Sequence, residues 1–341
     1  MKKVAIFNDT SISGHFGCIA VTSNLNDLLL DHNMEPVYFW PVGANWIPHS
    51  EKIKEELRNV DAVILNGEGT LHNDSSREQV SSLLQLPRFC NEKLKKPCFL
   101  VNATLHNMSK GAYLKLRDFQ MIFVRDRCSQ KFLRSINIES FLCPDLSFLG
   151  LNNVRYVNLS GKEEKNLQKK ILVTGSVLNN INHGLLNFAK KNGYQFEDMK
   201  PANSELNRWG ARQMWLVYED LRNFYPSFYH AHNFWLNHLA NQSFIFTGRF
   251  HCVTMCLGLK KPFFAFESNT PKISNLLNDI FDKTNRVLRH KDIEGFFSRN
   301  YKADLDFAFS SKELQKIEDY LKNGEIKCHN MATQIANSLN K

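Results

Sequence analysis

Short apolar runs alternate with amphipathic stretches along most of the chain. Short, continuous apolar runs are typical of strands that are buried on both faces of a sheet, and the stretches between them have helical periodicity. The pattern therefore predicts an α/β fold built on mostly parallel sheets. The predicted strands lie at residues 3–7, 36–40, 61–65, 98–101, 121–124, 171–174, 243–247 and 262–266. The predicted helices lie at 19–30, 51–58, 129–133, 185–191, 205–240, 252–257, 272–280 and about 311–339.

The alternation pauses in a polar stretch over about residues 150–168, which we interpret as a linker. A chain of 341 residues is long enough for two domains at about 150 residues each. We predict two Rossmann-like, doubly wound domains, 1–155 and 170–341, that face a cleft. The C-terminal helix belongs to the second domain. We expect it to pass back across the linker and to pack against the first domain. Ligands of such sheets bind beyond the carboxyl ends of the strands, so the residues after each strand are the candidates.

Composition narrows the class of protein. A hydrophobic fraction of 43% with 23% charged residues excludes an intrinsically disordered chain. No apolar run approaches the roughly 18 residues of a membrane span, and Met1–Phe7 reaches the polar Asn8 too soon for a signal peptide. The eight scattered cysteines fit reduced, mostly buried thiols. We therefore expect a cytoplasmic protein.

The net charge of +9 favours acidic partners, such as phosphorylated small molecules, anionic glycans or lipid head groups. It also allows peripheral contact with the inner face of a membrane. No run of basic residues is interleaved with aromatics as in a nucleic-acid platform, so we expect no nucleic acid as a partner.

Three candidate catalytic residues follow predicted strands of the first half. Asp9 ends the first strand, and His15 lies between two glycines at the following helix entrance. Glu68 lies between Gly67 and Gly69 in a tight turn after the third. Each residue also has a plainer, structural interpretation. Asp9 and Glu68 can simply belong to the turns in which they lie, and His15 can simply be exposed. After the fifth strand, Arg125 is a candidate anion ligand, while Asp126 suits a helix cap.

The second half has two candidate segments. Arg249 and His251 follow one strand through Gly248, so we expect a planar cation for an anionic group and a proton donor near neutral pH. Ser268, Asn269 and Lys272 stand where another strand meets a helix, which suits a phosphate site or simply a capped helix. Cys252 and Cys256 are four residues apart on an apolar helix, which favours core packing over a metal site, and no metal is expected.

Taken together, these segments resemble the polysaccharide pyruvyl transferase family. The resemblance covers about residues 1–285 and is one of order and spacing. It is carried by Asn8-Asp9, Asp61 to Thr70, Arg125-Asp126 with Ser129, Pro144-Asp145, Gly248-Arg249-Phe250-His251, and Lys272. Gly67-Glu68-Gly69 departs from the pattern, since family members often have a glycine run there.

The resemblance implies a fold like that of glycosyltransferase-B enzymes, with an acceptor side in the first half and a donor side in the second. It implies transfer of the enolpyruvyl unit of phosphoenolpyruvate to sugar hydroxyls as a pyruvate ketal, with no cofactor. Arg125, Arg249 and His251 match the family's donor-binding positions. Cations must neutralise the donor's two anionic groups, an acid must protonate its methylene carbon, and a base must accept the hydroxyl proton. We assign His251 as the acid and leave the base open among Asp9, His15 and Glu68.

The alternative is a glycosyltransferase that uses a nucleotide-activated sugar, an acidic one included. In that case Arg249, Ser268 and Lys272 would bind the nucleotide phosphates. Either activity would serve capsule, exopolysaccharide or lipopolysaccharide assembly, with a glycan or lipid-linked glycan as acceptor. A non-catalytic glycan-binding protein on the same scaffold is a third class, which the density of ionisable residues at strand ends disfavours.

Overall fold

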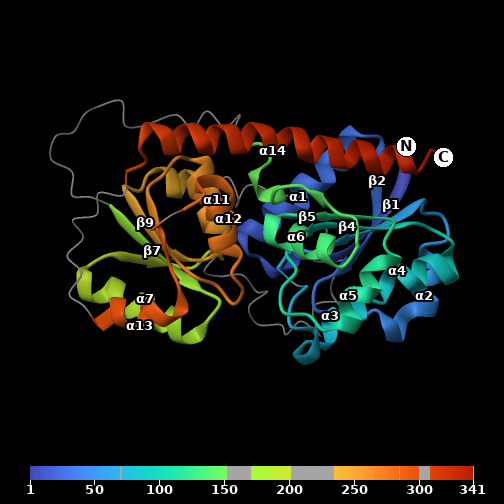
Figure 1. The fold of residues 1–341 in the computed structure, drawn as a ribbon, viewed down its shortest axis with the longest axis horizontal. Coiled ribbons are helices and arrows are strands. Elements are labelled where there is room, and N and C mark those ends of the chain that lie inside the picture. Colours follow the sequence, from blue (N-terminus) through green and yellow to red (C-terminus); the bar gives the residue numbers. More distant parts are fainter. Residues whose placement is uncertain (70, 152–169, 201–233, 284, 299–307, 341) are drawn as a thin grey trace. The chain divides into compact units, whose positions relative to one another are not determined.

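The computed structural model describes the chain except residues 70, 152–169, 201–233, 284, 299–307 and 341. It contains two α/β units (Figure 1). Unit 1 holds Met1–Leu146 and the chain end from Gly324, and unit 2 holds the described residues of Ser147–Ala202 and Tyr229–Asn323. The stretch that we interpret as a linker, and most of the aromatic segment at 205–240, lie outside the described residues.

The sheet of unit 1 has six parallel strands in the order β2-β1-β3-β4-β5-β6. Every residue of β3 and β4 is buried, because a parallel sheet of this kind is covered by helices on both faces. The strand order reverses between β1 and β3, so the ligand edge of this sheet lies at their carboxyl ends. The strands are β1 (Lys2–Asp9), β2 (Met34–Pro41), β3 (Ala62–Asn66), β4 (Cys98–Ala103), β5 (Met121–Val124) and β6 (Phe141–Leu142).

The helices of unit 1 divide between the two faces of its sheet. Right-handed crossovers place α1 on one face and α2 to α6 on the other, because the chain moves in opposite directions from β1 and from β3. Leu65, Leu100 and Val124 of the sheet form one core with Ala112 of α5 and Leu133 of α6. The helices are α1 (Phe16–Asp31), α2 (Ser50–Glu56), α3 (Glu78–Leu83), α4 (Leu86–Phe89), α5 (Lys110–Lys115) and α6 (Arg127–Ser135).

Unit 2 has a five-stranded parallel sheet in the order β11-β10-β9-β7-β8, with its reversal between β7 and β9. Its core on one face is a cluster of phenylalanines, in which Phe246, Phe264 and Phe266 meet Phe188 and Phe296. The strands are β7 (Ile171–Ser176), β8 (Gln195–Glu197), β9 (Phe244–Gly248), β10 (Phe263–Phe266) and β11 (Val287–Leu288). The helices are α7 (Asn179–Asn192), α11 (Phe250–Gly258), α12 (Lys272–Phe281), α13 (His290–Ser298) and α14 (Ser311–Ser338).

Helix α14 has residues in both units. Its first part groups with unit 2, and its residues from Gly324 onward group with unit 1. In unit 1, the ring of His329 lies 5.3 Å from that of His32 at the end of α1, and the sulfur of Cys328 lies 3.5 Å from that of Cys143. The end of the chain is thereby packed against the first unit.

The predicted α/β class and the two Rossmann-like units are confirmed. All eight predicted strands are present, with ends that move by a residue or two. The short strands β8 and β11 and the helices α3 to α5 and α13 were not predicted, and α7 begins six residues before its predicted start. Within the described residues, no helix is long and apolar enough to cross a membrane. The predicted cleft between the halves stays a prediction.

Candidate functional site

Glu68 is a buried carboxylate in the loop after β3, beside the loop after β1. Its Oε2 accepts a hydrogen bond from the Thr10 hydroxyl, and its Oε1 accepts one from the Cys18 thiol at 3.2 Å. A Cβ at Gly67 would lie 2.6 Å from the Cβ of Ala103, so the chain can make this turn only with glycine there. The loop therefore fixes a carboxylate at the edge where the strand order reverses.

Asp9, at the end of β1, is also buried, but its carboxylate holds the local turn. Its Oδ1 accepts hydrogen bonds from the Ser11 backbone N–H at 3.0 Å, the Ser11 hydroxyl and the Thr22 hydroxyl at 3.2 Å. These contacts are what the plainer interpretation of Asp9 expects. Its catalytic role stays a prediction.

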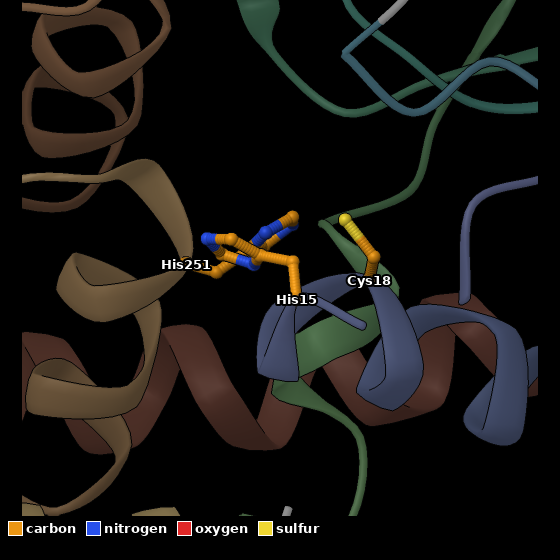
Figure 2. A group of neighbouring side chains, drawn as sticks. All are labelled: His15, Cys18 and His251. Carbon is orange, nitrogen blue, oxygen red and sulfur yellow. The ribbon is translucent and has the colours of Figure 1, made fainter. Parts of the chain in front are cut away.

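His15 is the N-cap of α1, since its Nδ1 accepts a hydrogen bond from the Gly17 N–H at 3.3 Å. A neutral ring that accepts at Nδ1 carries its proton on Nε2. Figure 2 shows His15 and Cys18 on neighbouring turns at the same end of α1. Cys18, which the sequence analysis did not single out, thus joins the start of α1 to Glu68.

Two asparagines at the carboxyl ends of β3 and β4 are a second feature that the sequence analysis missed. The Oδ1 of Asn66 accepts from the Glu68 N–H at 3.1 Å, and the Oδ1 of Asn102 accepts from the Leu146 N–H at 3.1 Å. These backbone donors fix the orientation of both amides. Both Nδ2 atoms are buried without a hydrogen-bond partner in the described part of the chain. Buried unsatisfied donors are uncommon, and a role in binding or catalysis is one explanation for them. The signal in the sequence was asparagine at the end of two apolar runs.

Arg125 lies in a buried ion pair at the end of β5. Its Nη1 donates to Asp145 and its Nε donates to the Thr104 hydroxyl at 2.8 Å, and both charged side chains are almost fully buried. Asp126 caps α6 by accepting from the Ser129 N–H at 2.8 Å, as one interpretation expected. Arg125 as a donor ligand stays a prediction, and the Asp145 carboxylate already occupies one side of its guanidinium.

Arg249 follows β9 and precedes α11 in unit 2. Its Nη2 donates to Asp198 Oδ1 at 3.0 Å, and its side chain is 15% exposed while that of Asp198 is 46% exposed. Its Nε is buried and has no hydrogen-bond partner among the described residues. The guanidinium therefore combines one accessible ion pair with one N–H that has no acceptor.

Glycines bring the backbone close to this guanidinium. A Cβ at Gly248 would lie 2.6 Å from that of Ser176, so β9 and β7 can approach only with glycine there. A Cβ at Gly175 would lie 3.6 Å from Nη2 of Arg249 and 2.4 Å from Oδ1 of Asn182. The carboxyl ends of β7 and β9 thus surround Arg249 at the reversal of strand order in unit 2.

His251, drawn in Figure 2, lies in the first turn of α11. It comes two residues after Arg249 in the sequence. It is buried, and its ring meets that of Phe250 edge-on at 5.4 Å. The next residue, Cys252, is fully buried with Cys256, as core packing requires. Burial raises the pKa of the Cys252 thiol, but hydrogen bonds with Cys256 and with neighbouring threonines outweigh it, and the net pKa is lowered.

The N-terminus of α12 is capped by a carboxylate of its own chain. Glu267 is buried and accepts from the backbone N–H groups of Ser268 at 3.0 Å and Ser274 at 3.1 Å. The Ser268 hydroxyl donates to Asn269, and Lys272 Nζ lies 5.9 Å from the Phe250 ring centre. The phosphate site predicted from these residues stays a prediction. Glu267, which was not among the candidates, provides the capped helix that the alternative interpretation expects.

Comparison of the chain with models of known protein families shows which family it belongs to. Residues 15–270 match the model of the polysaccharide pyruvyl transferase family. The chain belongs to this family. As a polysaccharide pyruvyl transferase family member it is a transferase, which confirms the predicted enzyme class. The match includes His15, Glu68, Arg125, Arg249 and His251. A search of curated proteins gave no significant match.

Solved structures confirm the fold of this family member. The UDP-GlcNAc 2-epimerase of Methanocaldococcus jannaschii, in complex with UDP-GlcNAc and UDP, is similar with a TM-score of 0.52 at 13% identity. The match covers 95% of this chain and 99% of that one. A putative UDP-N-acetylglucosamine 2-epimerase from Listeria monocytogenes also has a TM-score of 0.52, at 12% identity over 97% of this chain and 95% of its own. At these identities the likeness concerns the fold alone.

Proposed function

We propose that this transferase moves the pyruvyl group of phosphoenolpyruvate onto two hydroxyls of a sugar, as a ketal, in surface-polysaccharide assembly. The family supports the pyruvyl group and the glycan acceptor. The single observation that carries the donor is Arg249, whose guanidinium has one buried N–H with no acceptor among the described residues, beside an accessible ion pair. A planar guanidinium suits a carboxylate or a phosphate group, and phosphoenolpyruvate carries both.

In the proposed reaction, two sugar oxygens form bonds to C2 of phosphoenolpyruvate and the bond from C2 to the phosphate oxygen breaks. The methylene carbon gains a proton and becomes the methyl group of the ketal. The two hydroxyls lose one proton each, so one proton balances the methyl group and the other leaves with inorganic phosphate. We assign the protonation of the methylene carbon to His251, because an imidazolium titrates near neutral pH.

We favour Glu68 over Asp9 as the base that accepts the hydroxyl proton. The Glu68 oxygens bind a hydroxyl and a thiol, groups whose place a sugar hydroxyl can take. Asp9 also accepts from the Ser11 and Thr22 hydroxyls, but the Ser11 backbone N–H holds its carboxylate in its own turn. The amide groups of Asn66 and Asn102 lie on the same sheet edge and supply donors for sugar oxygens. In this proposal unit 1 binds the acceptor, a glycan or lipid-linked glycan.

A nucleotide-sugar donor is the second candidate. Both structural neighbours are named for enzymes of UDP-N-acetylglucosamine, which supports the alternative through the fold alone. With such a donor, Arg249 and Lys272 would bind the diphosphate.

Thermal unfolding distinguishes the two donors, since a ligand that binds only the native state raises its Tm. We expect phosphoenolpyruvate to raise the Tm and UDP, UDP-sugars and a CMP-linked acidic sugar to leave it unchanged. Stabilisation by a nucleotide and none by phosphoenolpyruvate would contradict the proposal. Release of inorganic phosphate that depends on added glycan then tests the transfer itself.

A further inference from the structure

The exposed cations of unit 1 form two groups. In the first, Arg58 on the segment after α2 pairs with Glu55 at 2.6 Å, and Arg88 on α4 pairs with Glu92 at 2.7 Å. In the second group, no carboxylate in the described part of the chain lies within ion-pair distance. Four members of that group lie close together: Lys110 on α5, Arg117 just after it, and Lys131 and Arg134 on α6. All four are exposed.

These four cations lie on one surface, because α5 and α6 pack side by side. The rings of Tyr113 and Phe132 lie 4.3 Å apart, and Arg117 Nη2 donates to the carbonyl of Ile136 at the end of α6 at 2.9 Å. Neither helix contains an acidic residue; Asp118 and Glu139 come after them along the chain. The cations of α6 lie opposite its buried stripe of Ser129 and Leu133.

Apolar side chains are exposed among these cations. Leu114 is 50% exposed and lies one turn from Lys110 on the same face of α5. Phe132 is 38% exposed and follows Lys131 on α6. We call these six residues, Lys110, Leu114, Arg117, Lys131, Phe132 and Arg134, the α5–α6 surface. Unpaired cations mixed with exposed apolar side chains are the composition of helices that lie on a bilayer.

We propose that the α5–α6 surface docks unit 1 onto a membrane that contains anionic phospholipid. The four cations complement the lipid phosphates, and each Lys or Arg at such a surface strengthens binding about fivefold. Leu114 and Phe132 would enter the boundary between head groups and acyl chains. A nucleic-acid backbone would match the cations but would leave Leu114 without an apolar partner, so the lipid is the better fit. The proposal requires neither the donor nor the acceptor of the reaction.

The test is sedimentation of the full chain with vesicles of phosphatidylcholine alone and of phosphatidylcholine with phosphatidylglycerol. We expect binding to the anionic vesicles only, weakened by salt. The double variant Lys131→Glu/Arg134→Glu should lose about 25-fold or more in affinity. Lys190→Glu/Lys322→Glu is the matched control, since both residues are exposed lysines of unit 2 and the charge change is the same. It should stay within about twofold of the parent.

The contribution of the two apolar side chains, Leu114 and Phe132, to membrane binding can be measured separately. Leu114→Ser/Phe132→Ser should weaken binding to anionic vesicles while it leaves all four cations in place. Cys128, an exposed thiol on α6, can carry a polarity-sensitive fluorophore whose emission should shift to the blue on those vesicles. Equal loss in the Lys190→Glu/Lys322→Glu control, no preference for anionic lipid, or binding to a DNA duplex but not to vesicles would each overturn the proposal.

Discussion

The two sheets have the same architecture but treat their charged groups differently at the carboxyl edge. In unit 1, Arg125 is buried with Asp145, and Asp9 is bound by its own turn. In unit 2, Arg249 pairs with a half-exposed Asp198, and its Nε–H has no acceptor in the part of the chain that the structure describes. A buried charge needs its partner, because loss of that partner leaves the charge uncompensated inside the protein, whereas a partly satisfied, accessible charge is suited to a ligand. From this contrast we predict a structural role for Arg125 in unit 1 and an anion-binding role for Arg249 in unit 2.

The largest expected effect is on stability in unit 1. Asp145→Ala leaves the Arg125 guanidinium buried without its carboxylate, which costs about 3–5 kcal/mol of unfolding free energy. Chemical denaturation measures this loss. Asp292→Ala on an exposed part of α13 is the control and should change stability by less than about 0.5 kcal/mol. Equal stability of the Asp145 and Asp292 variants would show that the ion pair of unit 1 is not structural.

In unit 2 the matching change should remove ligand binding. Arg249→Ala should abolish the rise in Tm with phosphoenolpyruvate while it changes the unfolding free energy by about 1 kcal/mol or less, because its ion pair is accessible. Arg249→Lys should recover only part of the binding, since a point charge cannot replace a planar fork. Arg289→Ala, an exposed arginine of the same unit, is the control. A full response to phosphoenolpyruvate in Arg249→Ala would remove this residue from the donor site.

His251 tests whether unit 2 also contributes chemistry. His251→Gln should keep donor binding and lower turnover by roughly a hundredfold or more, the scale of general acid–base catalysis. Calorimetry beside a phosphate-release assay separates this from a packing role for the buried ring. A lower Tm with unchanged turnover per folded molecule would leave His251 as a core residue.

The sequence showed where the carboxyl edge of each sheet lies, but not which side chains pair with one another along that edge. Apolar runs mark β1 to β5, β7, β9 and β10 because buried parallel strands are apolar throughout. The residues after them were therefore singled out as candidates. Pairing depends on which loops meet in space, so Asp198 as partner of Arg249 and Cys18 as partner of Glu68 had no signal in the sequence. Short strands such as β8 and β11 have too few residues for any periodicity.

The smallest expected effect concerns Asp198, whose carboxylate would compete with an anionic donor for the guanidinium of Arg249. Removal of its charge in Asp198→Asn should tighten phosphoenolpyruvate binding by about two- to fivefold, since a half-exposed carboxylate 3.0 Å from the guanidinium both occupies Nη2 and repels the ligand. Titration at low and high salt measures it, and the gain should shrink with salt. Asp292→Asn should show no gain. Weaker binding in Asp198→Asn at both salt concentrations would mean that the carboxylate orients Arg249 for the donor, and the ion pair of unit 2 would then resemble that of unit 1.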